Sequence, residues 1–362
     1  MPLAAVYEHS SCEILITSSC NMVCTYCIAR EIPSAHMDRD TGRKAIDLFL
    51  YLAQGCKTVE LVFTGGEPLI EFQTFKYLLH YADSHIREAG MQPYYVLKTN
   101  GTILDNNIIK FLRTNSVKVV VSFDGAPCTH NKHRKTANGQ GTQDVVMRNL
   151  GILRNNQVYC VASMTVHPDT VDEVLANVRF MHTLGIEELD VGPAYGTVSW
   201  SDSDSASFVQ SLMDVAEYMH VQHTCGHQLE VGPLFRKSQH IDGVLSDQWG
   251  CHAGSSNLAF LPNGKIAGCS ALAMIVSKFP ALVLGDVVNG LDQLAVDRML
   301  ETAQAGREAR EACKHCDVAK DCTGGCLAIN YSTTGAPLLP PVFYCKTIAA
   351  ISVGWCKAWG DH

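Results

Sequence analysis

The run Cys20-Asn21-Met22-Val23-Cys24-Thr25-Tyr26-Cys27 decides how the rest of the chain is interpreted. Its three cysteines are spaced as C-x3-C-x2-C and follow a short apolar segment, 13–17. A [4Fe–4S] cluster normally takes four cysteines, so three thiolates leave one iron with an exchangeable position. A zinc site is the alternative, but structural zinc sites favour paired C-x2-4-C units with four ligands, and nothing adjacent completes such a set. The run therefore predicts an iron–sulfur cluster that can hold a substrate or cofactor.

Length and composition describe an ordinary globular protein. The chain has 362 residues, 47% hydrophobic and 18% charged, enough to bury a large core and to divide into two domains. A net charge of −8 argues against nucleic acid or anionic membrane as a partner. No apolar run approaches the length that spans a bilayer, and the first residues lack a secretory signal. The 16 cysteines cluster near the N-terminus and in the last third, which favours metal ligation in the cytoplasm over a disulfide scaffold.

Strand and helix patterns alternate through the first two-thirds of the chain. Helical periodicity separates the apolar runs, as in 46–53, where Thr41 is available as N-cap and Gly55 as a stop. Six βα units with short connections predict a parallel sheet, with the three-cysteine run at the carboxyl end of its first strand. The pattern alone does not separate a doubly wound sheet from a curved partial barrel. The apolar runs with strand character are 13–17, 59–63, 94–97, 117–121, 159–166 and 187–191.

Further motifs follow the ends of the predicted strands. The run Thr64-Gly65-Gly66-Glu67-Pro68 has two glycines that let the backbone turn tightly and approach a ligand closely. The run Ser122-Phe123-Asp124-Gly125 is followed by Arg134, whose guanidinium suits a carboxylate through two parallel hydrogen bonds. His130 and His133, which lie between Gly125 and Arg134, are expected to be solvated loop residues. Tyr195, after the sixth strand, is either a substrate contact or a packing residue.

A second cysteine array occupies the last third of the chain. The turn Pro262-Asn263-Gly264-Lys265 predicts a hairpin that brings Cys251 and Cys269 together. Seven cysteines are too many for one cluster and one short of two closed ones, and the C-x2-C-x5-C-x3-C spacing within them is not typical of zinc. The array consists of Cys251, Cys269, Cys313, Cys316, Cys322, Cys326 and Cys345. Five other cysteines, Cys12, Cys56, Cys128, Cys160 and Cys356, are expected to be buried small apolar residues.

The first cysteine run, with Thr25-Tyr26 inside it, resembles the signature of the radical S-adenosylmethionine (SAM) enzymes. The C-terminal array resembles the SPASM extension of that family. The resemblance implies an α/β fold, in which a partial (β/α)6 TIM-like barrel precedes a small cysteine-rich α+β SPASM domain. The expected boundaries are 1–224 for the barrel, 225–250 for a bridge and 251–362 for the SPASM domain. The implied cofactors are SAM and three [4Fe–4S] clusters.

The resemblance also assigns roles to residues. The SAM cluster would be held by Cys20, Cys24 and Cys27, auxiliary cluster I by Cys251, Cys269 and Cys326, and auxiliary cluster II by Cys313, Cys316, Cys322 and Cys345. The SAM contacts would be Tyr26, Gly65, Gly66, Glu67, Pro68, Ser122 and Arg134, with Met164, Val166 and His167 approaching the adenine. Asp124 and Tyr195 are the candidates for catalysis.

Two positions depart from the pattern of the sulfatase-maturing members. Those proteins have a further cysteine where this chain has Asn257, and a catalytic Asp where it has Ser270. Auxiliary cluster I is therefore expected to have an open iron or to take a ligand such as Cys225. An open iron suits a substrate thiolate, because thiolates are natural iron ligands.

The implied function is that of a radical SAM oxidoreductase. It would generate a 5′-deoxyadenosyl radical, abstract hydrogen and so oxidise or crosslink a side chain of a ribosomal peptide. The alternative is a radical SAM dehydrogenase acting on a small alcohol, sugar or amino acid. A non-catalytic iron–sulfur electron carrier is a third hypothesis, but a carrier needs no SAM site. Expected partners are the substrate, an external electron donor such as flavodoxin or ferredoxin and, because only 19 residues precede Cys20, any leader-peptide-binding module on another chain.

Overall fold

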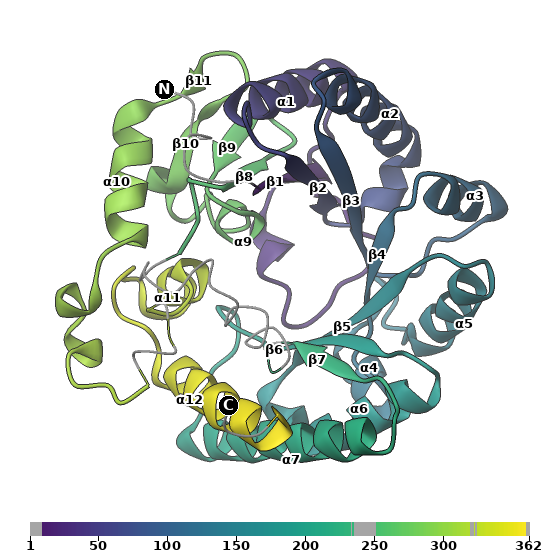
Figure 1. The fold of residues 1–362 in the computed structure, drawn as a ribbon, viewed down its shortest axis with the longest axis vertical. Helices are drawn as coiled ribbons and strands as arrows, with labels where there is room; N and C mark the ends of the chain where they lie inside the picture. Colours follow the sequence, from purple (N-terminus) through teal and green to yellow (C-terminus); the bar gives the residue numbers. More distant parts are fainter. Residues whose placement is uncertain (1–8, 233, 235–250, 319–321, 323, 360–362) are drawn as a thin grey trace.

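The protein is described from a computed structural model that covers residues 9–232, 234, 251–318, 322 and 324–359. Parallel strands form a curved sheet around the centre of the molecule (Figure 1). Neighbours along the chain are neighbours in the sheet from β1 to β7, which is the order expected of successive βα units. These strands are β1 His9–Thr17, β2 Thr58–Gly65, β3 Gln92–Thr99, β4 Lys118–Ser122, β5 Cys160–Val166, β6 Glu188–Pro193 and β7 Glu230–Gly232.

Helices cover the outer face of this sheet (Figure 1). Alternation along the strands explains the arrangement: in β4, Val119 and Val121 are buried, whereas Lys118 and Ser122 are half-buried and line a cavity inside the curve. The apolar faces of the helices complete the core outside the sheet. The helices are α1 Arg39–Leu52, α2 Phe72–Glu88, α3 Asn106–Thr114, α4 Pro127–His133, α5 Gln143–Asn155, α6 Val174–Thr183 and α7 Asp202–Thr224, with the short 3-10 helices η2 Ile28–Glu31, η3 Pro68–Glu71 and η4 Pro168–Glu173.

The start of α1 differs from the sequence expectation. Asp38, and not Thr41, is the N-cap, and its carboxylate accepts the amide hydrogen of Thr41 at 2.7 Å. An Asp three residues before that amide satisfies the free N–H as well as a Thr cap would, and it adds a negative charge at the positive end of the helix. Gly55, with φ of +96°, follows the helix as predicted.

The cysteine-rich part continues the same sheet on the other side of β1. Strand β8 (Asn257–Phe260) pairs with β1 in parallel, and β9 (Lys265–Ala267) returns beside it as the predicted hairpin. Antiparallel β10 (Val283–Asp286) and β11 (Gly290–Leu291) end the sheet. The remaining elements are α9 Ser270–Ala273, η5 Pro280–Leu282, α10 Gln293–Ala303, η6 Arg307–Ala309, η7 Glu311–Cys313, α11 Leu327–Thr334 and α12 Val342–Trp359.

Helix α12 closes the ring by packing along α7 (Figure 1). Phe343 stacks on Trp200 with ring centroids 5.2 Å apart, and Lys346 forms an ion pair with Asp202 at 2.7 Å. The predicted fold class is confirmed: a curved α/β barrel is followed by a smaller cysteine-rich α+β part. The exact boundaries stay a prediction. Strand β7 lies inside the expected bridge, and residues 235–250 of that bridge lie outside the described part of the chain.

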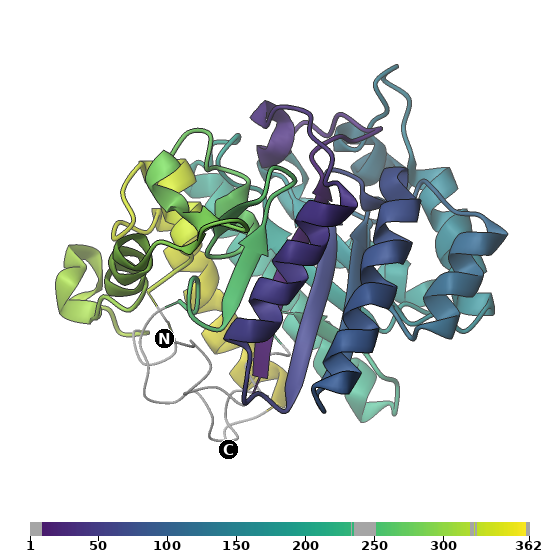
Figure 2. The same cartoon turned by 90° about the horizontal axis from the view of Figure 1, so that it is seen from above.

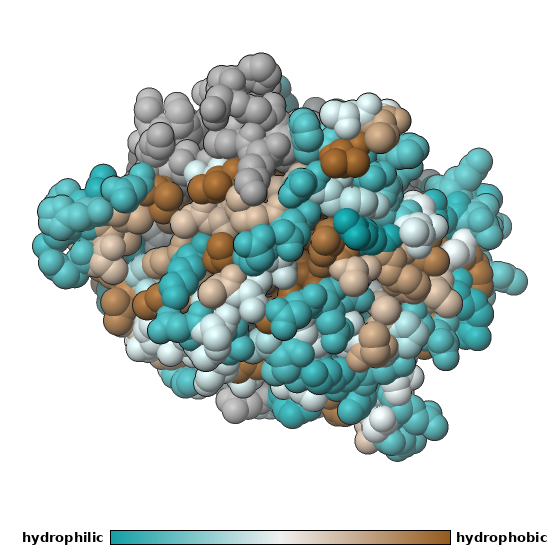
Figure 3. Space-filling model, turned by 90° about the horizontal axis from the view of Figure 1, so that it is seen from below, coloured by the Kyte–Doolittle hydropathy of each residue, from teal (hydrophilic) through white to brown (hydrophobic). Residues whose placement is uncertain are grey.

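Two further views show the ends and the surface of the barrel. The three-cysteine loop and η2 project beyond the ends of β1 and β2 (Figure 2). The opposite view shows hydrophilic and hydrophobic side chains intermixed over the visible face (Figure 3). Among the described residues, we find no helix with the length and apolar character needed to cross a membrane.

Candidate active site

A cavity of about 610 Å3 lies at the carboxyl end of the parallel strands, where the sequence predicts the chemistry to gather. This volume is in the range of small-molecule and cofactor sites. Both parts of the chain contribute to its wall. The three-cysteine loop supplies Tyr26 and Cys27, strand ends supply Gly65, Met164 and Gly192, and the C-terminal part supplies Ser270, Met274 and Tyr344.

The three-cysteine loop is fixed on one side by the segment after α4. The amides of Val23 and Thr25 donate to the carbonyls of Lys135 and His133, at 2.7 and 3.1 Å. The Thr25 hydroxyl also lies 2.7 Å from Nδ1 of His133. These bonds hold the backbone between the cysteines, which turns at Thr25 and Tyr26, so that the positions of the thiols depend on α4.

The backbone just before Cys20 is fixed by the two glycines at the end of β2, Gly65 and Gly66. The Gly66 amide donates to the Thr17 carbonyl at 2.7 Å. A Cβ on Gly65 would lie 2.1 Å from the oxygen of Thr17, and one on Gly66 would lie 2.2 Å from the oxygen of Ser19. Gly65 also has φ of +133°, which side chains with a Cβ rarely adopt. In this structure the two glycines therefore allow a close approach to the backbone just before Cys20, and their approach to a bound ligand stays a prediction.

Glu67 is buried completely below these glycines. Its carboxylate accepts hydrogen bonds from the Leu69 amide (3.0 Å), the Thr99 hydroxyl (2.8 Å) and the Asn100 amide (2.7 Å). Burial raises the pKa of the Glu67 carboxyl, and the two amides oppose that rise. Glu67 thus joins the ends of β2 and β3, and Pro68 is buried beside it.

The thiols of Cys20, Cys24 and Cys27 lie close enough to interact electrostatically, and none is in a disulfide. Burial and the neighbouring thiols raise the pKa of Cys24 to about 11, although the nearby Arg134 opposes the rise. A thiol that resists ionisation in this way becomes a thiolate when a metal supplies positive charge. The donor set therefore fits an iron–sulfur cluster with three protein ligands.

Close to Cys24, Arg134 forms a buried ion pair with Asp124. Its guanidinium binds both carboxylate oxygens of Asp124, at 2.8 and 3.0 Å. Asp124 also accepts from the Tyr26 hydroxyl and from the Thr165 amide. Asp124 is therefore 1% exposed with both oxygens engaged, and Arg134 places its charge next to Cys24.

The other two candidates for polar contact lie on the inner face of the barrel. Ser122 lines a second cavity of about 770 Å3 inside the curve of the sheet. Ser163, Asp190 and Gly232 line both cavities, so the two adjoin. Tyr195 lines the main cavity, and burial, followed by the thiols of the cysteine-rich part, raises the pKa of its hydroxyl.

Two charged residues of the inner face were missed by the sequence reasoning. Glu13 accepts from Lys98 Nζ at 2.8 Å and from the amide of Ser270, so it links the barrel interior to the residue after Cys269. Burial by itself would raise the pKa of the Glu13 carboxyl, but Lys98 and the hydrogen bond from Ser270 together outweigh burial and lower that pKa. The signal in the sequence is a charged residue at 13 directly before the apolar run 14–16.

The seven C-terminal cysteines form two groups in space. Cys251, Cys269 and Cys326 interact with one another, and burial raises the pKa of each thiol. This group lies beside the main cavity, because Tyr195 of the cavity wall interacts with Cys269 and Cys326. Cys225, a suggested further ligand, is exposed at the end of α7.

The second group consists of Cys313, Cys316, Cys322 and Cys345, which also interact with one another. Two arginines that the sequence did not single out lie at this group. Arg307 donates to the carbonyls of Cys313 (2.7 Å) and Cys316 (3.2 Å). Arg310 is 2% exposed and interacts with thiols of both groups, so its positive charge lies between them.

Several minor expectations were wrong. His130 and His133 are buried on α4 and are not solvated, because the loop after β4 folds as a helix against the barrel. Cys128 is exposed, whereas Cys12 and Cys56 are buried and Cys160 is half-buried. The side chain of Cys356 lies outside the described residues.

Comparisons with known proteins show which enzymes the chain resembles. The model of the radical SAM superfamily matches residues 14–181. The radical SAM cyclopropyl synthase TigE of Paramaledivibacter caminithermalis is 23% identical over 87% of this chain and 67% of its own length. A cysteine-type anaerobic sulfatase-maturating enzyme of Clostridium perfringens is 23% identical over 91% of this chain and 92% of its own. An uncharacterised protein of Methanocaldococcus jannaschii is 25% identical, and the match spans 59% of its length.

Solved structures share the fold. The enzyme anSMEcpe with bound AdoMet superposes with a TM-score of 0.81 at 20% identity, over 96% of each chain. SuiB of Streptococcus suis bound to precursor peptide SuiA gives a TM-score of 0.64 at 14% identity, over 92% of this chain and 75% of that one. Residues 14–181 therefore match the radical SAM superfamily, and the chain as a whole resembles a radical SAM cyclopropyl synthase and anaerobic sulfatase-maturating enzymes and shares the fold of anSMEcpe.

Proposed function

We propose that this protein is a radical SAM oxidoreductase that oxidises or crosslinks a side chain of a ribosomally made peptide. The observation that carries the proposal is the shared cavity: Cys27 of the first cysteine loop lines one side, and Ser270 and Tyr344 of the cysteine-rich part line the other. A substrate in this cavity would lie between the two sets of thiols. Such a position suits a reaction in which the SAM cluster starts the radical chemistry and an auxiliary cluster accepts the electron that is released.

Cys20, Cys24 and Cys27 would hold a [4Fe–4S] cluster whose remaining iron position takes SAM. When bound, these groups supply the 5′-deoxyadenosyl radical that removes a hydrogen atom from the substrate. Tyr26 and Gly65 line the cavity and would contact SAM directly. The contacts proposed from the family pattern also include Gly66, Glu67, Pro68, Ser122 and Arg134. Of these, we expect Glu67 and Arg134 to act by holding the cysteine loop, since protein partners occupy both side chains.

Cys251, Cys269 and Cys326 would hold auxiliary cluster I, with an exchangeable position beside the cavity. Cys313, Cys316, Cys322 and Cys345 would hold auxiliary cluster II, which brings the count to three [4Fe–4S] clusters. These clusters would accept an electron from the substrate radical. Arg310, between the two groups, would offset the negative charge of their thiolates.

A peptide substrate is supported by the relatives that share the fold. SuiB is bound to its precursor peptide in one of these structures, and anSMEcpe is bound to a peptide in another, at a TM-score of 0.80 and 20% identity. An external electron donor, such as flavodoxin or ferredoxin, and a separate leader-peptide-binding protein belong to the same proposal.

Cleavage of SAM tests the radical chemistry. Anaerobically reconstituted protein with dithionite should release 5′-deoxyadenosine from SAM, and Cys24→Ala should abolish the release. Cys128→Ala is the matched control, because Cys128 is an exposed cysteine outside all three groups. Cleavage that survives Cys24→Ala would show that the cluster assignment is wrong.

Co-expression tests the substrate class. The protein should be produced with short peptides from neighbouring genes, and each peptide analysed by mass spectrometry. Loss of two hydrogens from a peptide, dependent on Cys24, is the expected result. Intact peptide masses together with dehydrogenation of a small alcohol, sugar or amino acid would favour the competing function.

A further inference from the structure

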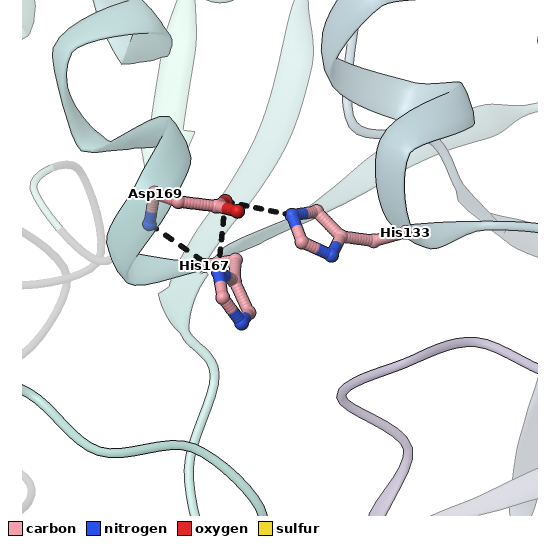
Figure 4. Close-up of side chains that lie close together, drawn as sticks. All are labelled: His133, His167 and Asp169. Carbon is pink, nitrogen blue, oxygen red and sulfur yellow. Dashed lines mark hydrogen bonds and ion pairs between the residues drawn. The ribbon is translucent and has the colours of Figure 1, made fainter.

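Three potential metal-binding side chains converge beside the cysteine loop without involving any cysteine (Figure 4). His133 comes from the end of α4, and His167 and Asp169 come from the start of η4. Nε2 of His133 and Nδ1 of His167 each lie 2.8 Å from Oδ1 of Asp169. The two imidazole rings stack with centroids 4.1 Å apart.

In this arrangement two ring nitrogens lie beside one carboxylate oxygen, Oδ1 of Asp169. Nδ1 of His167 accepts the backbone amide hydrogen of Asp169 at 3.3 Å. A ring nitrogen that accepts that hydrogen cannot also donate one to the carboxylate. The 2.8 Å contact with Oδ1 is satisfied either by a cation between the two atoms or by a proton on Nδ1 in place of the longer bond from the amide. Lys132 already binds the other oxygen, Oδ2, at 3.0 Å, so its charge does not fill this place.

His133 is oriented as metal-binding histidines usually are. Its second nitrogen, Nδ1, lies 2.7 Å from the Thr25 hydroxyl. A hydrogen bond from Nδ1–H to that oxygen would fix the tautomer and leave the lone pair of Nε2 directed at the Asp169 carboxylate.

We propose that His133, His167 and Asp169 bind one divalent transition metal of the zinc class. Two imidazoles and one carboxylate, with water as the fourth ligand, form a known donor set for zinc. Ligand bonds of about 2.0–2.1 Å place neighbouring donors of a tetrahedron about 3.3 Å apart. The 2.8 Å pairs must therefore open by about half an ångström. The side chains of His167 and Asp169, 22% and 44% exposed, have room to move and allow the ion to enter.

The metal would stabilise the segments that hold the three-cysteine loop in place. It would join η4 to the end of α4, and through the His133–Thr25 contact it would steady the loop between Cys24 and Cys27. The donor atoms are nitrogen and oxygen, a set that suits zinc better than an iron–sulfur cluster. This site goes beyond the proposed function and does not depend on the identity of the substrate.

Metal analysis of the holoprotein tests the proposal. Protein produced with added zinc and purified anaerobically should contain about one zinc per chain in addition to iron. His167→Ala and Asp169→Asn should each reduce the zinc content at least tenfold while the iron content stays the same. His85→Ala is the matched control, because its half-buried ring lies on α2 and contacts the Tyr81 carbonyl, and it should leave both metals unchanged.

Zinc K-edge absorption spectroscopy of the unmodified protein identifies the zinc ligands without the use of any variant. A shell of nitrogen and oxygen at about 2.0–2.1 Å with no sulfur is expected. A sulfur shell at about 2.3 Å would place the zinc on cysteines and overturn the proposal. Protein that takes up no zinc, or variants that retain it in full, would overturn it as well.

Discussion

The contact between Gly66 and the cysteine loop leads to a sharp prediction for Gly66→Ala. The new Cβ would lie 2.2 Å from the Ser19 oxygen and 2.7 Å from the Ser18 oxygen, whereas real Cβ contacts essentially never fall below 3.0 Å. The backbone before Cys20 must therefore move by about 0.8 Å, because a carbonyl cannot rotate away as a flexible side chain can. Misplacement of a catalytic group by about 1 Å costs on the order of 100-fold in rate. We expect 5′-deoxyadenosine release to fall by about this factor.

The assay is single-turnover release of 5′-deoxyadenosine under dithionite, with iron counted in the same samples. Gly151→Ala on α5 is the matched control, since a Cβ there meets nothing within 4 Å. It should leave the rate unchanged and stabilise the helix by about 0.5–1 kcal/mol. A Gly66→Ala protein with the rate and iron content of the unmodified enzyme would refute the reasoning that these glycines position the cysteine loop.

Three further outcomes follow from the same site. Arg134→Met should lower the free energy of unfolding by about 3–5 kcal/mol in denaturant titrations, because it leaves the Asp124 carboxylate buried without its cationic partner. A change below about 1 kcal/mol would contradict this prediction. Burial lowers the pKa of His130 to about 4, so the folded state resists protonation of this ring. The contribution of His130 to the free energy of unfolding should therefore be complete above pH 6.5 and decrease as the pH falls toward 4. His130→Gln should remove that part of the pH dependence, and an unchanged pH profile of this variant would contradict the prediction. Tyr195→Phe keeps the ring that lines the cavity and removes only the hydroxyl, so SAM cleavage should persist. The amount of modified product formed per 5′-deoxyadenosine should fall at least tenfold. An unchanged ratio of product to 5′-deoxyadenosine would show that Tyr195 is a packing residue.

Much of the fold and the first group of cysteines is predictable from local patterns, whereas the division of the C-terminal cysteines came from the family resemblance. Alternating strands and helices predict the parallel sheet, and Asn263-Gly264 predicts the hairpin between β8 and β9. Spacing along the chain brings Cys20, Cys24 and Cys27 together within one loop. These features are predictable because each depends on residues that are close in sequence.

The parts that escaped prediction depend on contacts between distant segments. Nothing near Glu67 in sequence shows that Thr99 and Asn100 bind its carboxylate, or that Asp124 occupies Arg134. Such pairs form because a polar group that the fold buries must find a partner, and the partner is decided by how the strands lie side by side. The pairing of β8 with β1 was missed for the same reason, since their register joins Ser11 to Asn257.

Iron content tests the central claim, that one chain holds a radical-generating site and two auxiliary cysteine groups around one cavity. Anaerobically reconstituted protein should contain about twelve irons per chain, in three [4Fe–4S] clusters. Replacing Cys251, Cys269 and Cys326 with Ala should remove about four of them, and replacing Cys313, Cys316 and Cys322 should remove a different four. About four irons in the unmodified protein, unaffected by either set of replacements, would contradict the account.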